Sequence, residues 1–208
     1  MFGVAVGVFQ ENTFFLRAPG RPETVIVDPG AEAEKLIGTV RSHRWEPVAI
    51  VNTHAHLDHV GAVQELKEAF EIPFLLHPED LDILRSAPET AEWFGVPAPA
   101  VPEVDRPLGD RERLDLGGMA IQVLHTPGHT PGGASLVAGD RVFVGDTLFH
   151  GSIGRTDLPG GDYDLLIRSI RERLLALPDE TIVHSGHGPD TTIGRERRAN
   201  PFLRETGK

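Results

Sequence analysis

The segment Thr53–His59 reads THAHLDH and contains four residues of the types that bind metal ions, His54, His56, Asp58 and His59. It follows the β-branched run VAIVN, which predicts a buried strand, and precedes VGAVQELKEAF, whose apolar spacing predicts a helix. On a loop between two such elements, the backbone can direct imidazoles and a carboxylate at one point. A regular strand or helix cannot do this with residues so close in sequence. The motif therefore predicts a metal site where a strand ends.

Three further candidate ligands occupy similar positions later in the chain. His129 lies in HTPGHTPGG, where proline and glycine enforce a loop after the predicted strand MAIQVL. Asp146 ends the apolar run RVFVGD, and His187 lies in TIVHSGHG. Because each is reached where a strand gives way to a loop, a packed sheet scaffold can hold all of them at one edge. Asp146 taken alone would fit a turn or helix cap as well as a ligand, and its place in this series favours the ligand.

Imidazole and carboxylate ligands suit zinc, iron or manganese. The chain has no cysteine, which excludes thiolate sites and iron–sulfur clusters. A lone histidine is more often a surface or core residue than a ligand, and we assign His77, His125, His150 and His184 to that class. His184 lies within a predicted strand and is expected to point away from the site.

These motifs resemble those of the metallo-β-lactamase superfamily, and within it the short-chain glyoxalase II-like (hydroxyacylglutathione hydrolase-like) branch. The resemblance extends from the opening strands to GRERRANP near the end of the sequence. It implies an α/β fold, a four-layer αββα sandwich in which two mixed sheets are flanked by helices, with the metal ions at one edge between the sheets. We expect one such domain over residues 1–208.

The family pattern also implies two metal ions, zinc or iron, with manganese a further option, bridged by Asp146. The other ligands it implies for the first ion are His54, His56 and His129. Those for the second ion are Asp58, His59 and His187. Asp28, at the end of VIVD, resembles the acidic residue that ends an early strand in this superfamily. It would support the motif loop through hydrogen bonds to backbone or imidazole, or else open a turn before Pro29.

Two metal ions about 3.5–4 Å apart can share a hydroxide, because coordination lowers the pKa of water to near 7. That hydroxide is the expected nucleophile, and Asp58 would orient it in addition to its ligand role. Ser152 and Ser185 lie near the motifs, but neither sits in a G-x-S-x-G elbow, which disfavours a serine hydrolase. The sequence therefore predicts a dinuclear metal-dependent hydrolase, a thioesterase of the glyoxalase II-like type acting on a small acyl thioester.

The main alternative is a mononuclear iron dioxygenase acting on a persulfide. The resemblance implies that such an enzyme would use only His54, His129 and Asp146. The GRTD within GSIGRTDLPGGD resembles sulfur dioxygenases of this type as well as short glyoxalase II-like hydrolases. A lactonase is a third option. A non-catalytic binding module is least expected, because a chain freed from catalysis has no reason to keep all the candidate ligands.

Arg155, in that same loop, is the candidate substrate-binding residue, because its planar guanidinium can hold a carboxylate in bidentate fashion. It would fit equally well as a structural partner of Asp157. The segment HGPDTT departs from the tyrosine-containing pattern of full-length glyoxalase II enzymes, which also carry an additional C-terminal helical region with basic residues for glutathione. The expected substrate is a small anionic thioester whose thiol carrier stays open.

The formal net charge of −11 argues against a nucleic-acid partner, which requires a basic face. The basic stretch GRERR, residues 194–198, is expected to be a solvated helix face, with contact to an anionic substrate tail as the alternative. No segment approaches the roughly 18–20 apolar residues of a membrane span. The opening residues lack the features of a secretory signal, so a cytoplasmic location is expected.

Strand and helix patterns alternate along the chain, which favours a layered α/β architecture. Strands are predicted over residues 2–28 and 113–145 and at TIVHS. Helices are predicted from Ala33 to Arg44, from Tyr163 to Leu177 and from near Arg195. Residues 77–107, rich in proline and acidic residues, predict an excursion with short helical pieces near the mouth of the site.

Overall fold

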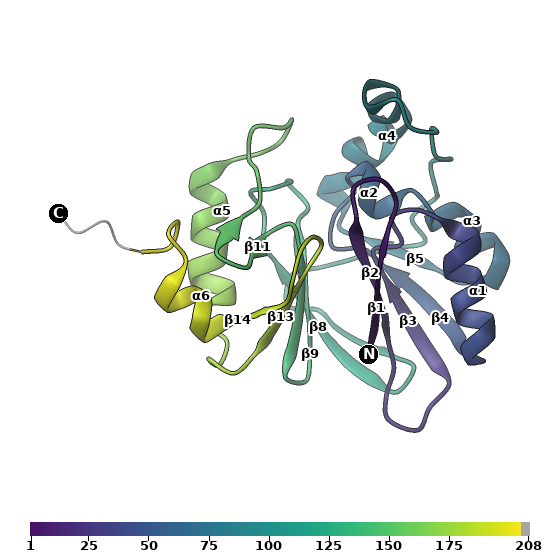
Figure 1. Ribbon diagram of the computed structural model, residues 1–208, viewed down its shortest axis with the longest axis horizontal. Helices are drawn as coiled ribbons and strands as arrows, with labels where there is room; N and C mark the ends of the chain where they lie inside the picture. The colour runs from purple at the N-terminus through teal and green to yellow at the C-terminus, as the bar shows by residue number, and fades with distance from the viewer. Residues whose placement is uncertain (205–208) are drawn as a thin grey trace.

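Two six-stranded mixed sheets form the middle layers of the molecule, and helices cover their outer faces (Figure 1). The computed structural model describes residues 1–204, so residues 205–208 of the predicted domain lie outside the described part. The predicted αββα sandwich is confirmed. Within the described residues, no helix is both long and apolar enough to cross a membrane.

The first sheet comes from the first half of the chain, and its strands follow one another in sequence order. They are β1 (Phe2–Val6), β2 (Glu11–Leu16), β3 (Glu23–Val27), β4 (Glu46–Val51), β5 (Phe74–Leu76) and β6 (Arg106–Pro107). Strands β1 to β3 pair antiparallel, whereas β3 to β6 pair parallel. Parallel pairing needs crossover connections. These contain α1 (Ala33–His43), α2 (Leu57–Val60), α3 (Val63–Phe70), the 3₁₀ turn η1 (Pro78–Asp80) and α4 (Leu81–Phe94).

The second sheet comes from the second half of the chain. Its order is β14 (Thr191–Thr192), β13 (Ile182–Ser185), β10 (Arg141–Gly145), β9 (Ala134–Ala138), β8 (Met119–His125) and β7 (Arg113–Leu116). Only β10 and β13 pair parallel among these strands. Their crossover contains the ribbon β11 (Leu148–Phe149) and β12 (Ser152–Ile153), α5 (Tyr163–Ser169) and the π-helical turn η2 (Ile170–Leu174). The last helix is α6 (Ile193–Ala199).

Alternation of side chains along the central strands produces three apolar clusters, one between each pair of layers. Val25 and Val27 of β3 lie in the cluster between the sheets, whereas Ile26 packs with residues of α1 and α3 on the outer face. In the second sheet, Phe143 of β10 faces the first sheet, and Val142 packs with α5 and η2. Both faces of each sheet are therefore buried, which explains the continuous apolar runs in the sequence.

Most predicted elements are confirmed in position. The first predicted helix ends one residue early, at His43, because Arg44 adopts a left-handed conformation and caps it. The helix predicted from Tyr163 to Leu177 starts as expected but changes to a π-helix and ends at Leu174. The last helix begins at Ile193, since the Thr192 side chain accepts the N–H of Arg195 as its N-cap.

The prediction of short helical pieces in residues 77–107 is wrong in one respect, because α4 runs for 14 residues. Its buried residues Leu84, Ala87 and Ala91 are spaced three and four apart and form one apolar stripe against the first sheet. The helix ends at Phe94, which lines the cavity that holds the candidate ligands. The expected position of this segment near the site mouth is confirmed.

Candidate metal centre

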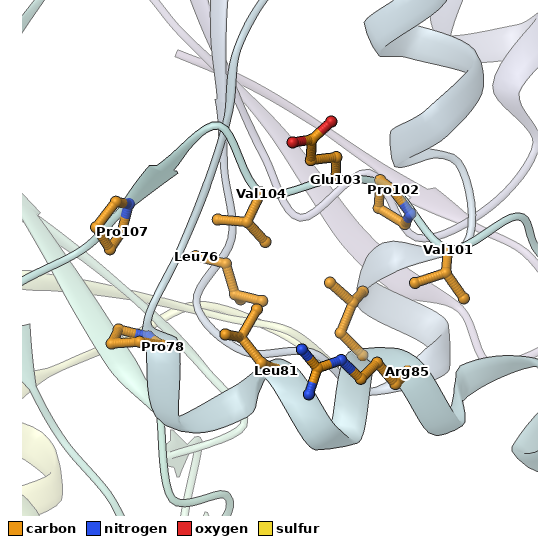
Figure 2. Close-up of a pocket in the computed structure, with 10 residues that line it drawn as sticks. Leu76, Pro78, Leu81, Arg85, Val101, Pro102, Glu103, Val104 and Pro107 are labelled. Atoms are coloured by element: carbon orange, nitrogen blue, oxygen red, sulfur yellow. The ribbon is translucent and has the colours of Figure 1, made fainter.

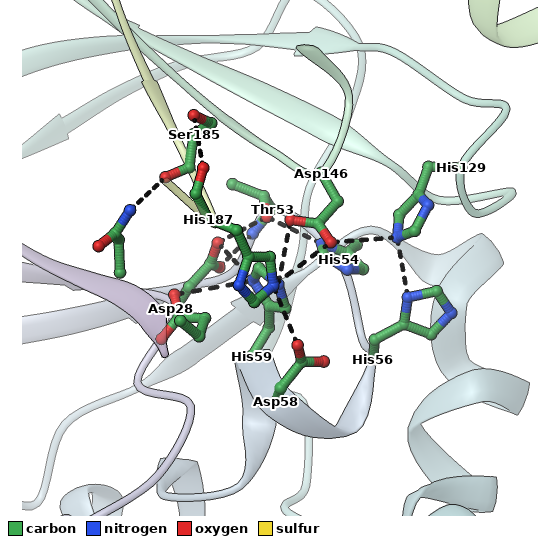
Figure 3. Close-up of polar contacts among 12 residues, drawn as sticks. Asp28, Thr53, His54, His56, Asp58, His59, His129, Asp146, Ser185 and His187 are labelled. Atoms are coloured by element: carbon green, nitrogen blue, oxygen red, sulfur yellow. Dashed lines mark hydrogen bonds and ion pairs between the residues drawn. The ribbon is translucent and has the colours of Figure 1, made fainter. Parts of the chain in front are cut away.

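The candidate ligands converge at the edge of the sandwich where strands of both sheets end (Figure 3). His54 and His56 follow β4, and the next two candidates, Asp58 and His59, lie on α2. The others follow strands of the second sheet: His129 after β8, Asp146 after β10 and His187 after β13. The two halves of the chain thus each supply part of one site.

The motif THAHLDH is not entirely a loop, which corrects the sequence expectation. Leu57–Val60 form the one-turn helix α2, with His56 as its N-cap in extended conformation. Consecutive residues of a helix point to different sides. Asp58 accordingly contacts His187, whereas His59 is fully buried and contacts Asp28 and Asp146.

Two groups of three candidate ligands form within this site. In each group, one ligand atom per residue lies within 4.8 Å of the others. The first group is His54, His56 and His129, and the second is Asp58, His59 and His187. The Nδ1 atom of His56 lies 2.9 Å from the Nε2 atom of His129, and the Nε2 atom of His187 lies 3.1 Å from an oxygen of Asp58.

Asp146 lies between these two groups (Figure 3). Its Oδ1 atom is 3.4 Å from the Nε2 atom of His59 in the second group. Its Oδ2 atom is 3.7 Å from the Nε2 atom of His129 in the first group and 3.6 Å from that of His187 in the second. One carboxylate is therefore near both groups.

At the centre, His54 Nε2, His59 Nε2 and Asp146 Oδ1 are buried and have no hydrogen-bond partner among the described residues. Buried polar atoms in native proteins almost always have a partner, so each such exception requires an explanation. Imidazole nitrogens and a carboxylate oxygen that converge without partners form a donor set suited to a zinc or iron ion. The residues present therefore fit a metal centre.

The opposite ring nitrogens of three histidines are held in place. His59 Nδ1 lies 3.1 Å from Asp28 Oδ2, His129 Nδ1 lies 2.7 Å from the carbonyl oxygen of Arg155, and His54 Nδ1 lies 3.1 Å from Thr53 Oγ1. Contacts of this kind fix the orientation and tautomer of a ligating imidazole. In all three rings they leave Nε2 facing the centre.

The histidines of the two ligand groups differ in their pKa. Burial and the neighbouring His129 lower the pKa of His56 to about 3, and burial also holds the pKa of His54 well below its ordinary value. Burial opposes the charged form of His59 as well, but Asp146 and Asp28 beside the ring raise its pKa well above the ordinary value. Ligands must be deprotonated to bind a metal ion, so binding at the second group would release a proton.

Asp28 supports the motif loop through hydrogen bonds. This is the first of the two roles expected for it, the other being to open a turn before Pro29. Its Oδ1 accepts the backbone N–H of Thr53 at 2.7 Å, and its Oδ2 accepts the Thr53 hydroxyl at 2.6 Å. Oδ2 is also the atom next to His59 Nδ1. Asp28 is buried and adopts a left-handed conformation at the end of β3, with φ of 49°.

Asp80 has a comparable role that the sequence did not reveal. Its buried carboxylate accepts the backbone N–H groups of Ala55 and Gly132 and the hydroxyl of Thr130. These contacts join the loop of His54 and His56 to the loop of His129. The only sequence signal is an acidic residue after a proline, which is typical of any helix start.

Glu11 is a second residue that sequence reasoning missed. It is fully buried, its Oε2 accepts the Thr13 hydroxyl, and its Oε1 lies 3.8 Å from His59 Nδ1. Burial raises the pKa of Glu11 well above its ordinary value. A charged residue opening a strand normally suggests an exposed position, so no pattern marked it as part of the centre.

Arg155 lies at the edge of a cavity of about 260 Å³ whose walls also include His56, Asp58 and His187. Its guanidinium makes two hydrogen bonds of 2.7 Å to the carboxylate of Asp157, and both side chains are largely exposed. This pairing lowers the pKa of Asp157 to about 2. The pairing of Arg155 with Asp157, one of the two roles expected for Arg155, is therefore present. Arg155 also lines the cavity at the centre.

The histidines assigned to other roles point away from the centre. The rings of His77 and His125 stack with centroids 4.1 Å apart and planes 11° apart, and His125 Nε2 contacts the carbonyl oxygen of Pro131. These two rings and Glu79 lie close enough to hold an ion. However, the rings are stacked, so their nitrogen lone pairs lie in parallel planes and do not converge on one point. His184 contacts Asp190 and Arg141, and His150 is exposed.

The GRERR stretch lies on α6 and forms ion pairs there. Arg197 and Arg198 pair with Asp179, and Arg195 pairs with Glu196. None of these arginines lines the cavity at the centre. The expectation of a solvated helix face fits these contacts.

Comparison with known proteins defines the class of this fold and centre. The sequence profile of the metallo-beta-lactamase superfamily matches residues 6–187, and the chain belongs to that superfamily. Among individual proteins, it is 42% identical to hydroxyacylglutathione hydrolase GloC of Haemophilus influenzae across 96% of each chain.

Two solved structures are similar over nearly their whole length. TTHA1623, crystallised in a di-iron-bound form, is 47% identical with a TM-score of 0.91, and the match covers 98% of this chain and 100% of that one. The B3 metallo-beta-lactamase BLEG-1 is 42% identical with a TM-score of 0.91 across 99% of each chain.

Proposed function

We propose that this chain is a dinuclear metal-dependent hydrolase that cleaves a small acyl thioester of an anionic thiol. The observation that carries the proposal is Asp146, a single carboxylate within 3.7 Å of histidines from both ligand groups and with a buried oxygen that lacks a partner. The similarity to GloC, a hydroxyacylglutathione hydrolase, supports the thioester as substrate. The di-iron form of TTHA1623 supports two metal ions, with iron as one candidate, and the imidazole and carboxylate ligands suit zinc as well.

In this proposal His54, His56 and His129 would hold one ion, Asp58, His59 and His187 would hold the other, and Asp146 would contribute to both. The bound ions would supply a water of lowered pKa and a Lewis acid for the carbonyl oxygen. The chain supplies a rigid frame for them, because Asp28, Thr53 and the carbonyl of Arg155 hold the ligand rings from behind.

Asp58 is the residue proposed to orient the attacking water. Although burial opposes ionisation, the hydrogen bond to His187 and the charge of His59 hold the pKa of Asp58 well below its ordinary value. Asp58 is therefore an acceptor at neutral pH, and it lines the cavity in which the scissile carbonyl would lie. It can accept a hydrogen bond from water and direct the oxygen lone pair at that carbonyl.

Arg155 is proposed to hold a carboxylate of the thiol carrier at the cavity edge. Its fork is paired with Asp157, but both groups are exposed, and exposed ion pairs contribute little free energy. A substrate carboxylate can therefore share or replace this partner at small cost. The negative net charge of the chain makes such a local cation useful for an anionic substrate.

The test compares substrates on metal-replete protein whose metal content is measured by elemental analysis. The panel contains S-lactoylglutathione, a simpler thioester, a lactone, glutathione persulfide and, because of BLEG-1, a β-lactam. We expect hydrolysis of the thioesters. Oxygen-dependent turnover of the persulfide without thioester hydrolysis would overturn the proposal in favour of an iron dioxygenase.

A further inference from the structure

A second cavity, of about 280 Å³, adjoins the one at the metal centre. The two cavities share Phe9, Leu57 and Asp58 in their walls. The remaining walls of the second cavity are largely apolar, with side chains of Val6, Val8, Ala31, Val96, Pro97 and Pro99. We call this second cavity the acyl groove. It lies between the β1–β2 turn and the segment that follows α4.

The acyl groove and the cavity at the centre differ in the charged side chains that line them. Within the described part of the chain, the charged side chains lining the groove are Glu32 and Asp58, both carboxylates. Glu32 accepts the backbone N–H of Gly7 and pairs with Lys35, which fixes it at the rim. The cation of the site, Arg155, lines the cavity at the centre and not the groove. An anionic substituent would therefore be repelled from the groove, whereas an uncharged apolar chain would be accepted.

Two aromatic residues mark the boundary between the cavities. Phe9 on the β1–β2 turn meets Phe94 at the end of α4 edge to face, with ring centroids 5.3 Å apart. Phe9 lines both cavities, and Phe94 lines the one at the centre. A substrate whose carbonyl lies beside Asp58 can thus extend one substituent past Phe9 and Leu57 into the groove while the other substituent reaches Arg155.

We propose that the acyl groove binds the acyl chain of the substrate, so that uncharged apolar acyl groups of several carbons are preferred to lactoyl. This inference rests on the proposed function and specifies its substrate. Beyond its carbonyl, a lactoyl group has only two carbons and a hydroxyl, and burying the hydroxyl among apolar side chains is unfavourable. Each methylene of a longer chain would instead gain roughly threefold to fourfold in binding.

The first experiment measures kcat/KM for the S-acetyl, S-butyryl, S-hexanoyl, S-succinyl and S-lactoyl thioesters of glutathione. We expect hexanoyl to exceed acetyl by at least about tenfold. Succinyl matches butyryl in chain length but ends in a carboxylate, and we expect it to be at least about tenfold poorer than butyryl. If lactoyl or succinyl equals the apolar chains, the groove does not bind the acyl group.

Binding without turnover is measured by calorimetry with S-methylglutathione and S-hexylglutathione, thioethers that cannot be hydrolysed. We expect the hexyl compound to bind at least about tenfold more tightly. Equal affinities would overturn the inference. If no thioester is hydrolysed at all, the proposed function fails, and the thioether comparison still reports whether the groove takes an apolar chain.

Val96 is the residue to vary, because it lines the groove beyond α4. Val96→Phe should fill the space and reduce both the hexanoyl-to-acetyl ratio and the hexyl-to-methyl ratio to within about threefold of one. Val96→Ala, which cannot overfill the groove, should shift the optimum toward longer chains. Unchanged ratios in both variants would contradict the inference.

A matched control exists in a separate groove of about 380 Å³ between α4 and residues 101–107 (Figure 2). Its lining includes Val101, Leu81 and Arg85, and it shares no residue with the acyl groove or the centre. Val101→Phe makes the same substitution on the same segment of the chain. It should keep the wild-type chain-length profile, and a loss of that profile would show that the effect of Val96→Phe is not local.

Discussion

The carboxylate of Asp80, at the start of α4, accepts the backbone N–H of Ala55 at 2.9 Å, between the two histidines of the motif loop. The same carboxylate binds Thr130 and Gly132, which follow His129 by one and three residues. One buried side chain therefore sets the distance between the two loops that supply the first ligand group. The excursion of residues 77–107 is tied to the centre through this contact.

Asp80→Ala should lower both stability and metal affinity. The substitution leaves three donors without an acceptor, and each buried unsatisfied donor costs about 1–3 kcal/mol. We expect the free energy of unfolding of the metal-free protein to fall by about 3 kcal/mol or more. Denaturant unfolding and metal titration measure the two effects. Glu103→Ala removes an exposed carboxylate of the same segment and should change neither.

Purified protein should bind up to two metal ions per chain, and their removal should lower the melting temperature. A ligand present at 100 times its dissociation constant stabilises a protein by about 2.7 kcal/mol. Elemental analysis gives the stoichiometry, anomalous scattering gives the positions, and thermal unfolding with and without chelator gives the stabilisation. If Asp58, His59 and His187 hold no ion in a metal-replete preparation, the dinuclear proposal fails.

Asp146→Ala should abolish activity and weaken the retention of both ions together, because it removes a carboxylate that lies near histidines of both groups. Metal content after gel filtration and hydrolysis of a thioester are the two measurements. His125→Ala is the matched control, since His125 stacks on His77 outside the centre and should keep both ions. Unchanged stoichiometry in the Asp146 variant would remove this residue from the bridge.

The positions of the candidate ligands were predictable because they follow strands. Loops that leave the same edge of two packed sheets must lie close together, so the sequence alone is enough to group His54, His129, Asp146 and His187. Asp28 was suggested by the family resemblance, with a turn before Pro29 as the alternative, and its carboxylate contacts Thr53 and His59. The ends of the strands can be located in the sequence because the buried strands are continuous apolar runs. The residue that follows each run can therefore be assigned to this edge of the sheets.

Asp80 and Glu11 were not predictable from the same sequence. The partners of Asp80 lie 25, 50 and 52 residues away, and no periodic pattern connects such positions. Glu11 is buried because its strand pairs beside the centre, and an isolated bridge links it to His187. The one-turn helix α2 was also missed, because four residues are too few for a helical pattern to be visible.

Arg155→Ala should mainly raise KM for an anionic thioester and leave kcat nearly intact. That pattern is expected when an interaction is equally strong in the ground state and the transition state. Asp157→Asn, which removes the charge of the pairing partner, should lower KM for the same substrate by freeing the guanidinium. Steady-state kinetics on both variants decide the role, and a large fall in kcat at constant KM for Arg155→Ala would contradict it.

Gly186→Ala should disrupt the centre, because the added methyl group would collide with candidate ligands. A Cβ atom there would lie 2.4 Å from Asp146 Oδ1 and 2.5 Å from His59 Cε1, so one of these groups must move. We expect loss of metal in this variant. Gly38→Ala is the control, because nothing lies within 4 Å of its Cβ in α1, and it should stabilise the protein by about 0.5–1 kcal/mol.

The segment between α4 and β6 supplies Val96, Pro97 and Pro99 to the acyl groove but none of the candidate ligands. Residues 95–105 of this segment form no helix or strand, so their length and sequence are not constrained by a hydrogen-bonded framework. Substitutions in this one short connection can therefore reshape the acyl groove while every candidate ligand stays in place. This part of the groove wall is encoded apart from the candidate ligands, whereas Phe9, Leu57 and Asp58 line both cavities.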